Sequence, residues 1–106
     1  MGPERRRSRR IERILSAEIR WHSGEGIYVR EAAETENVSS HGALLRLKPT
    51  TPVSAVISLR TAAGGSWQPA EVKRCDSEAP DGWTRLAIDL AEPSEAFWGV
   101  SLTSAV

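Results

Sequence analysis

The chain has 106 residues, of which 40% are hydrophobic and 26% are charged, and this composition predicts one globular domain with a modest core. Its formal net charge is zero, so the overall charge indicates no class of partner, and no apolar run approaches the ~20 residues of a membrane span. A single cysteine, Cys75, cannot form an internal disulfide. Nothing therefore indicates an oxidising compartment, and we expect a cytoplasmic protein.

The positive charge is concentrated at the N-terminus. Residues 1–13 contain six of the 14 basic residues and two of the 14 acidic ones, so this segment carries +4 and the rest of the chain carries −4. Arginine clusters attract phosphate groups, whether in nucleic acids, lipid headgroups or nucleotides. The segment is therefore either a specific clamp for a phosphate-bearing ligand or a solvated tail that binds any polyanion weakly.

Alternation of apolar and polar residues predicts six short strands, of which Val53–Leu59 is the most regular. Turn-forming stretches separate several of them, and Pro69 near the start of the fifth strand indicates an edge or a bulge. "EPSEAFW", 92–98, predicts one short helical turn with Ser94 as its N-cap. The expected strands are 15–22, 27–38, 43–48, 53–59, 67–75 and 85–90. This spacing predicts an all-β fold, a small antiparallel barrel or sandwich.

Side chains that carry catalysis or hold metals are scarce. His22 and His41 are the only histidines, and no HxxxH or CxxC spacing occurs, so we expect no metal site. Ser40 and His41 are neighbours in an extended segment, and such neighbours point to opposite faces, which is poor geometry for a nucleophile and its base. We therefore expect no enzymatic activity and no cofactor.

Two motifs remain, and together they resemble a known family. The first is a pair of arginines four residues apart, Arg6 and Arg10, with Arg5 and Arg9 as the alternative register. The second is "NVSSHG", 37–42, which has the form [D/N]xSxxG. In this order, about thirty residues apart and on a six-strand pattern with a terminal "FW" pair, they resemble the PilZ domain, a family of bacterial cyclic di-GMP receptors.

The resemblance covers about residues 4–99 and implies a six-stranded antiparallel β-barrel. It implies a flexible, arginine-rich, ligand-clamping segment at 1–12, the barrel at 13–100 and a tail at 101–106. It also implies that cyclic di-GMP is bound by Arg6, Arg10, Asn37, Ser39 and Gly42, and we consider Arg5, Arg9, His41 and Arg74 as candidates for further contacts. The sequence departs from the family pattern at Asn37, where aspartate is commoner, and at Ala87, where glycine is usual and where we expect an effect on packing.

The chemistry of these residues suits the implied ligand. An arginine fork matches a phosphate edge and the O6/N7 edge of guanine. Asn37 can donate and accept towards a guanine edge, Ser39 can donate, and Gly42 permits close approach. Taken alone, however, Asn37, Ser39 and Gly42 also fit ordinary turn chemistry.

The sequence thus favours a cyclic di-GMP receptor that orders its arginine segment on the ligand and signals to a protein partner. One alternative is an interaction module of the same fold that binds a protein but not cyclic di-GMP. Another is a nucleic-acid binder with a basic arm. The second alternative is disfavoured because residues 14–106 are net acidic and have few strand-face aromatics interleaved with basic residues.

Overall fold

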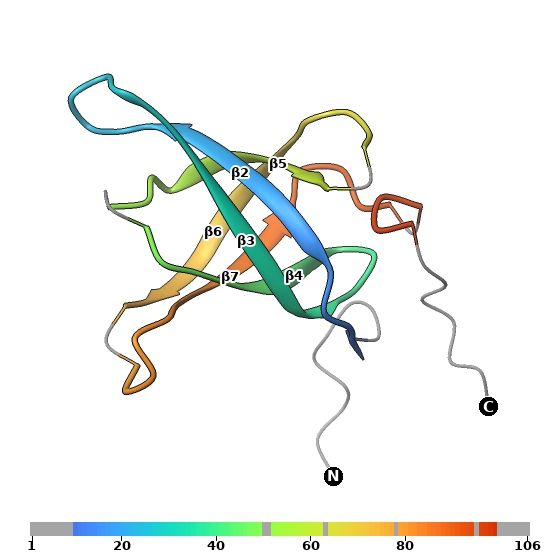
Figure 1. Ribbon diagram of the computed structural model, residues 1–106. Helices are drawn as coiled ribbons and strands as arrows, with labels where there is room; N and C mark the ends of the chain where they lie inside the picture. Colours follow the sequence, from blue (N-terminus) through green and yellow to red (C-terminus); the bar gives the residue numbers. More distant parts are fainter. Residues whose placement is uncertain (1–9, 50–51, 63, 78, 95, 100–106) are drawn as a thin grey trace, which may run out of the picture.

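The computed structural model describes residues 10–49, 52–62, 64–77, 79–94 and 96–99 (Figure 1). Every regular element in this part of the chain is a strand, and the expected all-β class is confirmed. The strands are β1 (Ile11–Glu12), β2 (Ser16–His22), β3 (Tyr28–Val38), β4 (Gly42–Leu47), β5 (Val56–Thr61), β6 (Gln68–Asp76) and β7 (Thr84–Leu90). No helix among the described residues is long and apolar enough to cross a membrane.

The six longer strands form a closed antiparallel barrel. The order of hydrogen-bonded neighbours is β1-β3-β2-β5-β6-β7-β4, and a further pairing of β3 with β4 closes the ring. The predicted six-stranded barrel is therefore confirmed. The long β3 makes this closure possible, because it pairs with β2 along its first part and with β4 along its last part.

Alternate residues of each strand fill the interior. In β2 the buried residues are Ala17, Ile19 and Trp21, while Glu18 and Arg20 between them face outward. Each fully buried aliphatic side chain contributes about 1.5–3 kcal/mol relative to an exposed one. The largest of the fully buried side chains are Ile19, Thr35, Val38, Leu45, Leu47, Ile57, Leu59, Leu86 and Ile88.

Three details of the strands differ from the sequence prediction. The fourth predicted strand begins at Val56 rather than Val53, although Val53 still packs against the core. Pro69 is the second residue of β6 and precedes the β6–β7 ladder, which starts at the pair Ala70–Leu90, so no ladder hydrogen bond to β7 is lost there. The bulge in β6 lies instead between Val72 and Arg74.

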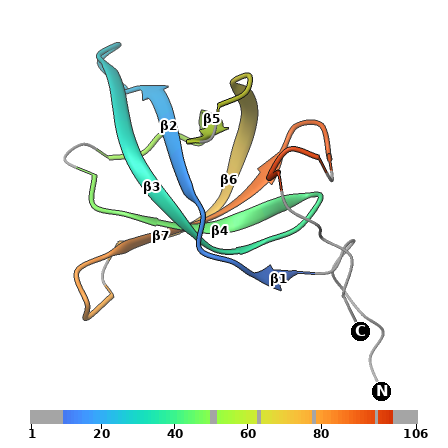
Figure 2. The same cartoon turned by 45° about the vertical axis from the view of Figure 1, so that its right-hand side comes forward.

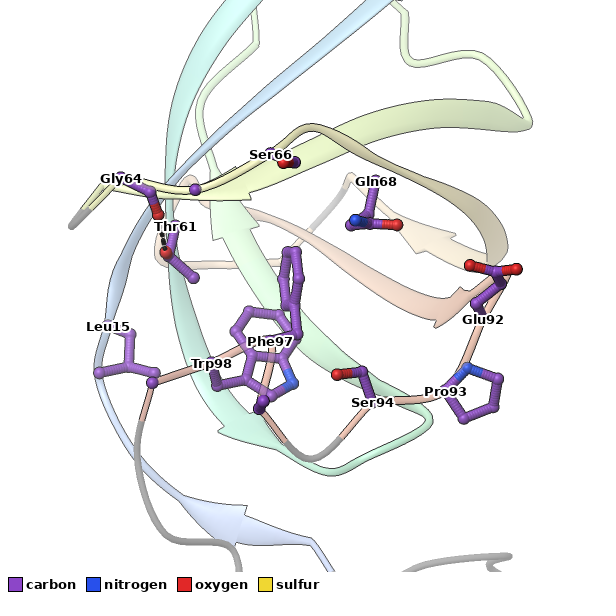
Figure 3. Close-up of a pocket in the computed structure, with 13 residues that line it drawn as sticks. Leu15, Thr61, Gly64, Ser66, Gln68, Glu92, Pro93, Ser94, Phe97 and Trp98 are labelled. Atoms are coloured by element: carbon purple, nitrogen blue, oxygen red, sulfur yellow. Dashed lines mark hydrogen bonds between the residues drawn. The ribbon is translucent and has the colours of Figure 1, made fainter.

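The segment after β7 lies across one end of the barrel. The expected helical turn is a single hydrogen-bonded turn, in which the amide of Gly99 donates to the carbonyl of Ala96 at 3.1 Å. The rings of Phe97 and Trp98 meet edge to face at 4.8 Å. Both residues line a pocket of about 630 Å³, with Leu15 on one side of the pair and Ser94 on the other (Figure 3). Trp98 is only 3% exposed, so the aromatic pair helps to close this end of the barrel.

The limits expected for the N-terminal segment and the C-terminal tail stay a prediction, because residues 1–9 and 100–106 lie outside the described part of the chain. Strand β1 was not predicted, since two residues are too short to show an alternation. It lies at the margin of the barrel beside the end of β3 (Figure 2).

Candidate functional site

Strand β1 brings the end of the arginine cluster to the second motif. Ile11 and Glu12 pair with Val38 and Asn37, which therefore lie between β1 and β4. Directly before β1, Nη1 of Arg10 donates to Oδ1 of Asn37 at 2.8 Å. One arginine of the first motif thus contacts the first residue of the second, whereas Arg5, Arg6 and Arg9 lie outside the described residues.

A buried threonine holds the chain between β1 and β2 in place. The hydroxyl of Thr35 donates to the carbonyl of Arg13 at 2.6 Å and accepts from the amide of Leu15 at 2.8 Å. Thr35 itself is fully buried. Because this hydroxyl is tied to the barrel wall, the path of the chain that leads back to Arg10 is fixed by the fold.

A β-bulge turns Asn37 outward. The register of β3 against β4 shifts between Thr35 and Asn37, so Glu36 is the additional residue. Thr35 and Val38 are both buried, whereas Glu36 and Asn37 between them are partly exposed. Without the bulge, Asn37 would alternate with Glu36 and point into the core.

The turn from β3 to β4 is built by Ser39. Its Oγ accepts hydrogen bonds from the amides of His41 and Gly42, both at 3.2 Å, and its own amide donates to the carbonyl of Gly42 at 2.8 Å. Ser39 is 3% exposed. This is the turn chemistry that the sequence left open for Ser39, and a ligand could reach its hydroxyl only if the turn opened.

Gly42 is required by the contact between β4 and β7. A Cβ built on Gly42 would collide with the carbonyl oxygen of Ile88, and it would lie 2.9 Å from the carbonyl carbon of Ile88 and 3.1 Å from Cα of Asp89. The glycine therefore permits close approach, as expected, but the approaching group is the barrel's own backbone. The neighbouring His41 is half-buried, with Nδ1 3.4 Å from Oγ of Ser40.

Asn37 begins a row of outward-facing residues that crosses four strands. The register pairs Asn37 with Leu44, Leu44 with Ala87, and Ala87 with Arg74. Directly paired residues lie on the same face of a sheet, so Arg74 shares a surface with Asn37. At about 4.8 Å between strands, Arg74 lies about 14 Å from Asn37 and can contact only the far part of a ligand seated there.

Leu44 and Ala87 are the members of this row that the sequence did not indicate as part of a ligand site. The alternation of "GALLRL" and "TRLAIDL" contained the signal, but only the register shows that the two residues are adjacent. Ala87 is partly exposed on the outer face, and the expected effect of alanine at this position on packing stays a prediction. A small residue there leaves the middle of the row flat.

Charged side chains border the row on one side. Arg85 donates to both carboxylate oxygens of Glu36 at 3.0 and 3.1 Å, and to Asp81 at 2.8 Å. Arg46 donates to Glu34 at 2.8 Å. The contacts with Asp81 and Glu36 raise the pKa of Arg85 further above its usual range. These pairs fix the outer face of the bulge, and the arginines remain charged at every accessible pH.

Acidification is expected to weaken the barrel partly through Asp81. Hydrogen bonds from the Arg85 side chain and then from the Trp83 amide lower the pKa of Asp81 from 3.8 to about 2. Since this folded-state pKa is the lower one, the stabilisation by the carboxylate is present above about pH 4 and is lost as the pH falls through about 2.

The Asp81→Asn variant should therefore show a smaller loss of thermal midpoint between pH 5 and pH 2 than the wild-type chain. Circular dichroism measures both midpoints, and Glu25→Gln, in the exposed turn between β2 and β3, serves as the control. Equal losses of thermal midpoint in the wild-type and Asp81→Asn chains would contradict the assignment of this acid-sensitive stabilisation to Asp81.

The described residues contain no group of three or more histidine, cysteine, aspartate or glutamate side chains that could hold a metal ion.

No family model matches the sequence, and no curated protein matches it. Solved structures do match. The chain superposes on the Bacillus subtilis inhibitor of motility, MotI/DgrA, with a TM-score of 0.65 and 16% identity, over 92% of this chain and 49% of that one.

The second match is the PilZ domain with cyclic di-GMP of YcgR from Escherichia coli. The TM-score is 0.59 at 14% identity, over 83% of this chain and 79% of that one. The chain has a PilZ-like fold. The resemblance that the two motifs predicted is therefore confirmed at the level of the fold, and the chain spans about half the length of MotI/DgrA.

Proposed function

We propose that the chain is a receptor module for cyclic di-GMP, without catalytic chemistry of its own. The observation that carries this proposal is the 2.8 Å hydrogen bond from Arg10 to Asn37, because it joins the two PilZ-type motifs in one place. The likeness to the YcgR domain supports it as well, since that structure contains the nucleotide.

The ligand site we propose is the outward row from Asn37 to Arg74, with the arginine segment folding over it. Arg6 and Arg10 bind phosphate or the Hoogsteen edge of guanine through their forks. Asn37 recognises a guanine edge, and Leu44 and Ala87 provide a flat apolar floor. Ser39 and Gly42 act indirectly, because they hold the turn that carries the site.

Calorimetric titration of the full chain with cyclic di-GMP at about 0.15 M salt tests the proposal. We expect saturable binding in the micromolar range or tighter, with one or two ligands per chain, and much weaker binding of GMP. Absence of binding would favour the alternative in which the chain is an interaction module that binds a protein but not cyclic di-GMP. Equal binding of single-stranded DNA with a steep salt dependence would instead favour the nucleic-acid binder.

We propose that ligand binding is communicated to a partner protein through the segment after β7. Two carbonyls of the motif turn accept hydrogen bonds from it: Ser39 from Nε1 of Trp98 at 2.8 Å and Ser40 from the amide of Ser94 at 2.7 Å. The next carbonyl, that of His41, accepts from the amide of Leu90 at the end of β7, at 2.7 Å. Any movement of the turn on ligand binding therefore changes contacts of this segment.

This coupling predicts that cyclic di-GMP shifts the indole N–H resonance of Trp98 in a ¹H–¹⁵N spectrum. The shift should saturate together with the calorimetric heat, and Trp98→Phe assigns the resonance by its disappearance. The buried Trp21, whose Nε1 donates to the carbonyl of Pro52, should stay unmoved. Saturating ligand that leaves Trp98 unchanged would contradict the proposed route.

A further inference from the structure

A second feature of the outer surface lies away from the motif row. Three arginines from three strands gather around one indole: Cζ of Arg20, Arg60 and Arg30 lies 4.1, 4.7 and 5.6 Å from the ring centroid of Trp67. We call these residues together with Glu18 the Trp67 cluster. Register explains the gathering, since Arg20 pairs with Arg30, Glu18 pairs with Arg60, and Trp67 directly precedes β6.

The Trp67 cluster has an excess of positive charge. Its one carboxylate, Glu18, accepts from Arg60 at 2.7 Å and from Arg30 at 2.9 Å. Hydrogen bonds from Arg60 and then Arg30 lower the pKa of Glu18, so this carboxylate is ionised at neutral pH. Three guanidiniums against one carboxylate leave the cluster at +2.

The cluster is both ordered and accessible. The side chains of Arg30 and Arg60 are 47% and 31% exposed, and Trp67 is half-buried. Stacking on the indole restricts the arginine rotamers before any partner arrives, which lowers the entropy lost on binding. Tryptophan and arginine are also the residues that most often dominate binding energy in protein interfaces.

The other outward tryptophan provides a contrast within the same barrel. Trp83 has Arg46 at 5.4 Å and Lys48 at 4.7 Å from its ring. There, however, the carboxylates of Glu34, Glu36 and Asp81 pair with Arg46 and Arg85. The excess positive charge is therefore a property of the Trp67 cluster and not of every tryptophan on the surface.

We propose that the Trp67 cluster is a docking surface for an acidic segment of a partner protein. Guanidinium forks match carboxylates in a bidentate geometry, and charge complementarity selects such a partner. Nucleic acid fits less well, because the stacked guanidiniums occupy the ring on which a base would stack. A phosphate backbone also needs a longer positive track than this cluster offers.

The proposal does not rest on binding of cyclic di-GMP. The cluster lies on the wall formed by β2, β3 and β5, whereas the row from Asn37 to Arg74 runs over the end of β3 and across β4, β7 and β6 (Figures 1 and 2). The two surfaces can be occupied together. A module of this kind can hold its partner on one wall and its ligand on the other.

The test is a ¹H–¹⁵N titration of the full chain with a capped hexaglutamate peptide, with hexaglutamine as the neutral control. We expect a saturable shift of the Trp67 indole resonance, at least fivefold larger than that of Trp83, and no shift with hexaglutamine. Arg20→Glu should weaken this binding at least tenfold, whereas Lys73→Glu, an equal charge change at an exposed position of β6, should weaken it less than twofold.

Three results would overturn the proposal. They are an unmoved Trp67 resonance at about 5 mM peptide, equal effects of Arg20→Glu and Lys73→Glu, and a stronger response of Trp67 to hexathymidylate than to hexaglutamate. Thermal unfolding of both variants controls for misfolding. If Arg20→Glu does not fold, Arg20→Gln serves in its place, with the same order of affinities expected.

Discussion

Gly42→Ala is expected to lower the free energy of unfolding by about 3 kcal/mol or more, or to prevent folding altogether. The added Cβ would collide with the carbonyl oxygen of Ile88 and would lie 3.1 Å from Cα of Asp89. Both neighbours are backbone of the paired strand β7, so no side-chain rotation relieves the contact. Strand β4 would have to separate from β7 at the start of their ladder.

Urea unfolding followed by tryptophan fluorescence measures this effect. Gly24→Ala is the matched control, because no atom lies within 4 Å of a Cβ at Gly24 and its backbone angle suits any residue. That variant should stay within about 0.5 kcal/mol of the wild-type chain. Equal stability of the two variants would contradict the structural role of Gly42. Gly42 would then again be a candidate for direct contact with the ligand.

This prediction bears on how binding data for the second motif are read. Loss of cyclic di-GMP binding in a Gly42 or Ser39 variant would not identify a ligand contact. Ser39 is buried and its hydroxyl is used within the turn, so its removal also disturbs the platform. Asn37 and Arg10 are the described motif residues whose substitution reports most directly on the ligand.

Arg10→Ala is expected to weaken binding of cyclic di-GMP about 10- to 100-fold. A hydrogen bond from a charged donor contributes about 1.5–3 kcal/mol, and each 1.4 kcal/mol corresponds to a factor of ten in affinity. Arg10→Lys should recover little of the loss, because an ammonium group cannot form the two parallel bonds of the guanidinium fork. Calorimetry on the three chains measures the effect.

Arg13→Ala is the control for charge. It removes the same charge three residues further on, and the carbonyl of Arg13 that accepts from Thr35 is kept. We expect its affinity to stay within threefold of the wild-type value. Equal losses of affinity in the Arg10 and Arg13 variants would mean that the basic segment attracts the ligand only through its net charge. Unchanged affinity in Arg10→Ala would contradict the proposal that the arginine segment clamps the ligand.

The fold could largely be predicted from the sequence because most strands have one buried and one outward face. Alternation identifies this difference well, as in β2, where buried Ala17, Ile19 and Trp21 alternate with polar residues. Alternation does not locate the first ladder hydrogen bond, so the start of β5 was placed too early at Val53. It also cannot reveal a two-residue strand such as β1.

The candidate site could be predicted only in part, because it depends on the register of the strands. The two motifs predict that Arg10 and Asn37 share one site, and the structure brings these two side chains into contact. The bulge at Glu36 that turns Asn37 outward has no signal in a single sequence. The adjacency of Leu44, Ala87 and Arg74 likewise follows from pairing across the barrel wall.

The Trp67 cluster could not be predicted from the sequence, because it too depends on the register of the strands. Arg20, Arg30 and Arg60 are far apart along the chain, and each reads as an ordinary outward residue of a strand. Only the closed sheet brings them to one indole. Its charge excess is visible only when the carboxylate partners of each arginine are known.

The most direct test of the central claim is a backbone ¹H–¹⁵N titration of the full chain with cyclic di-GMP. The account predicts saturable shifts that are largest for residues 37–44 and extend along the row to Ala87 and Arg74, with the Trp67 cluster little affected. No shifts, or shifts confined to the Trp67 cluster or to the pocket beside Phe97, would contradict the claim that the row beginning at Asn37 is the ligand site.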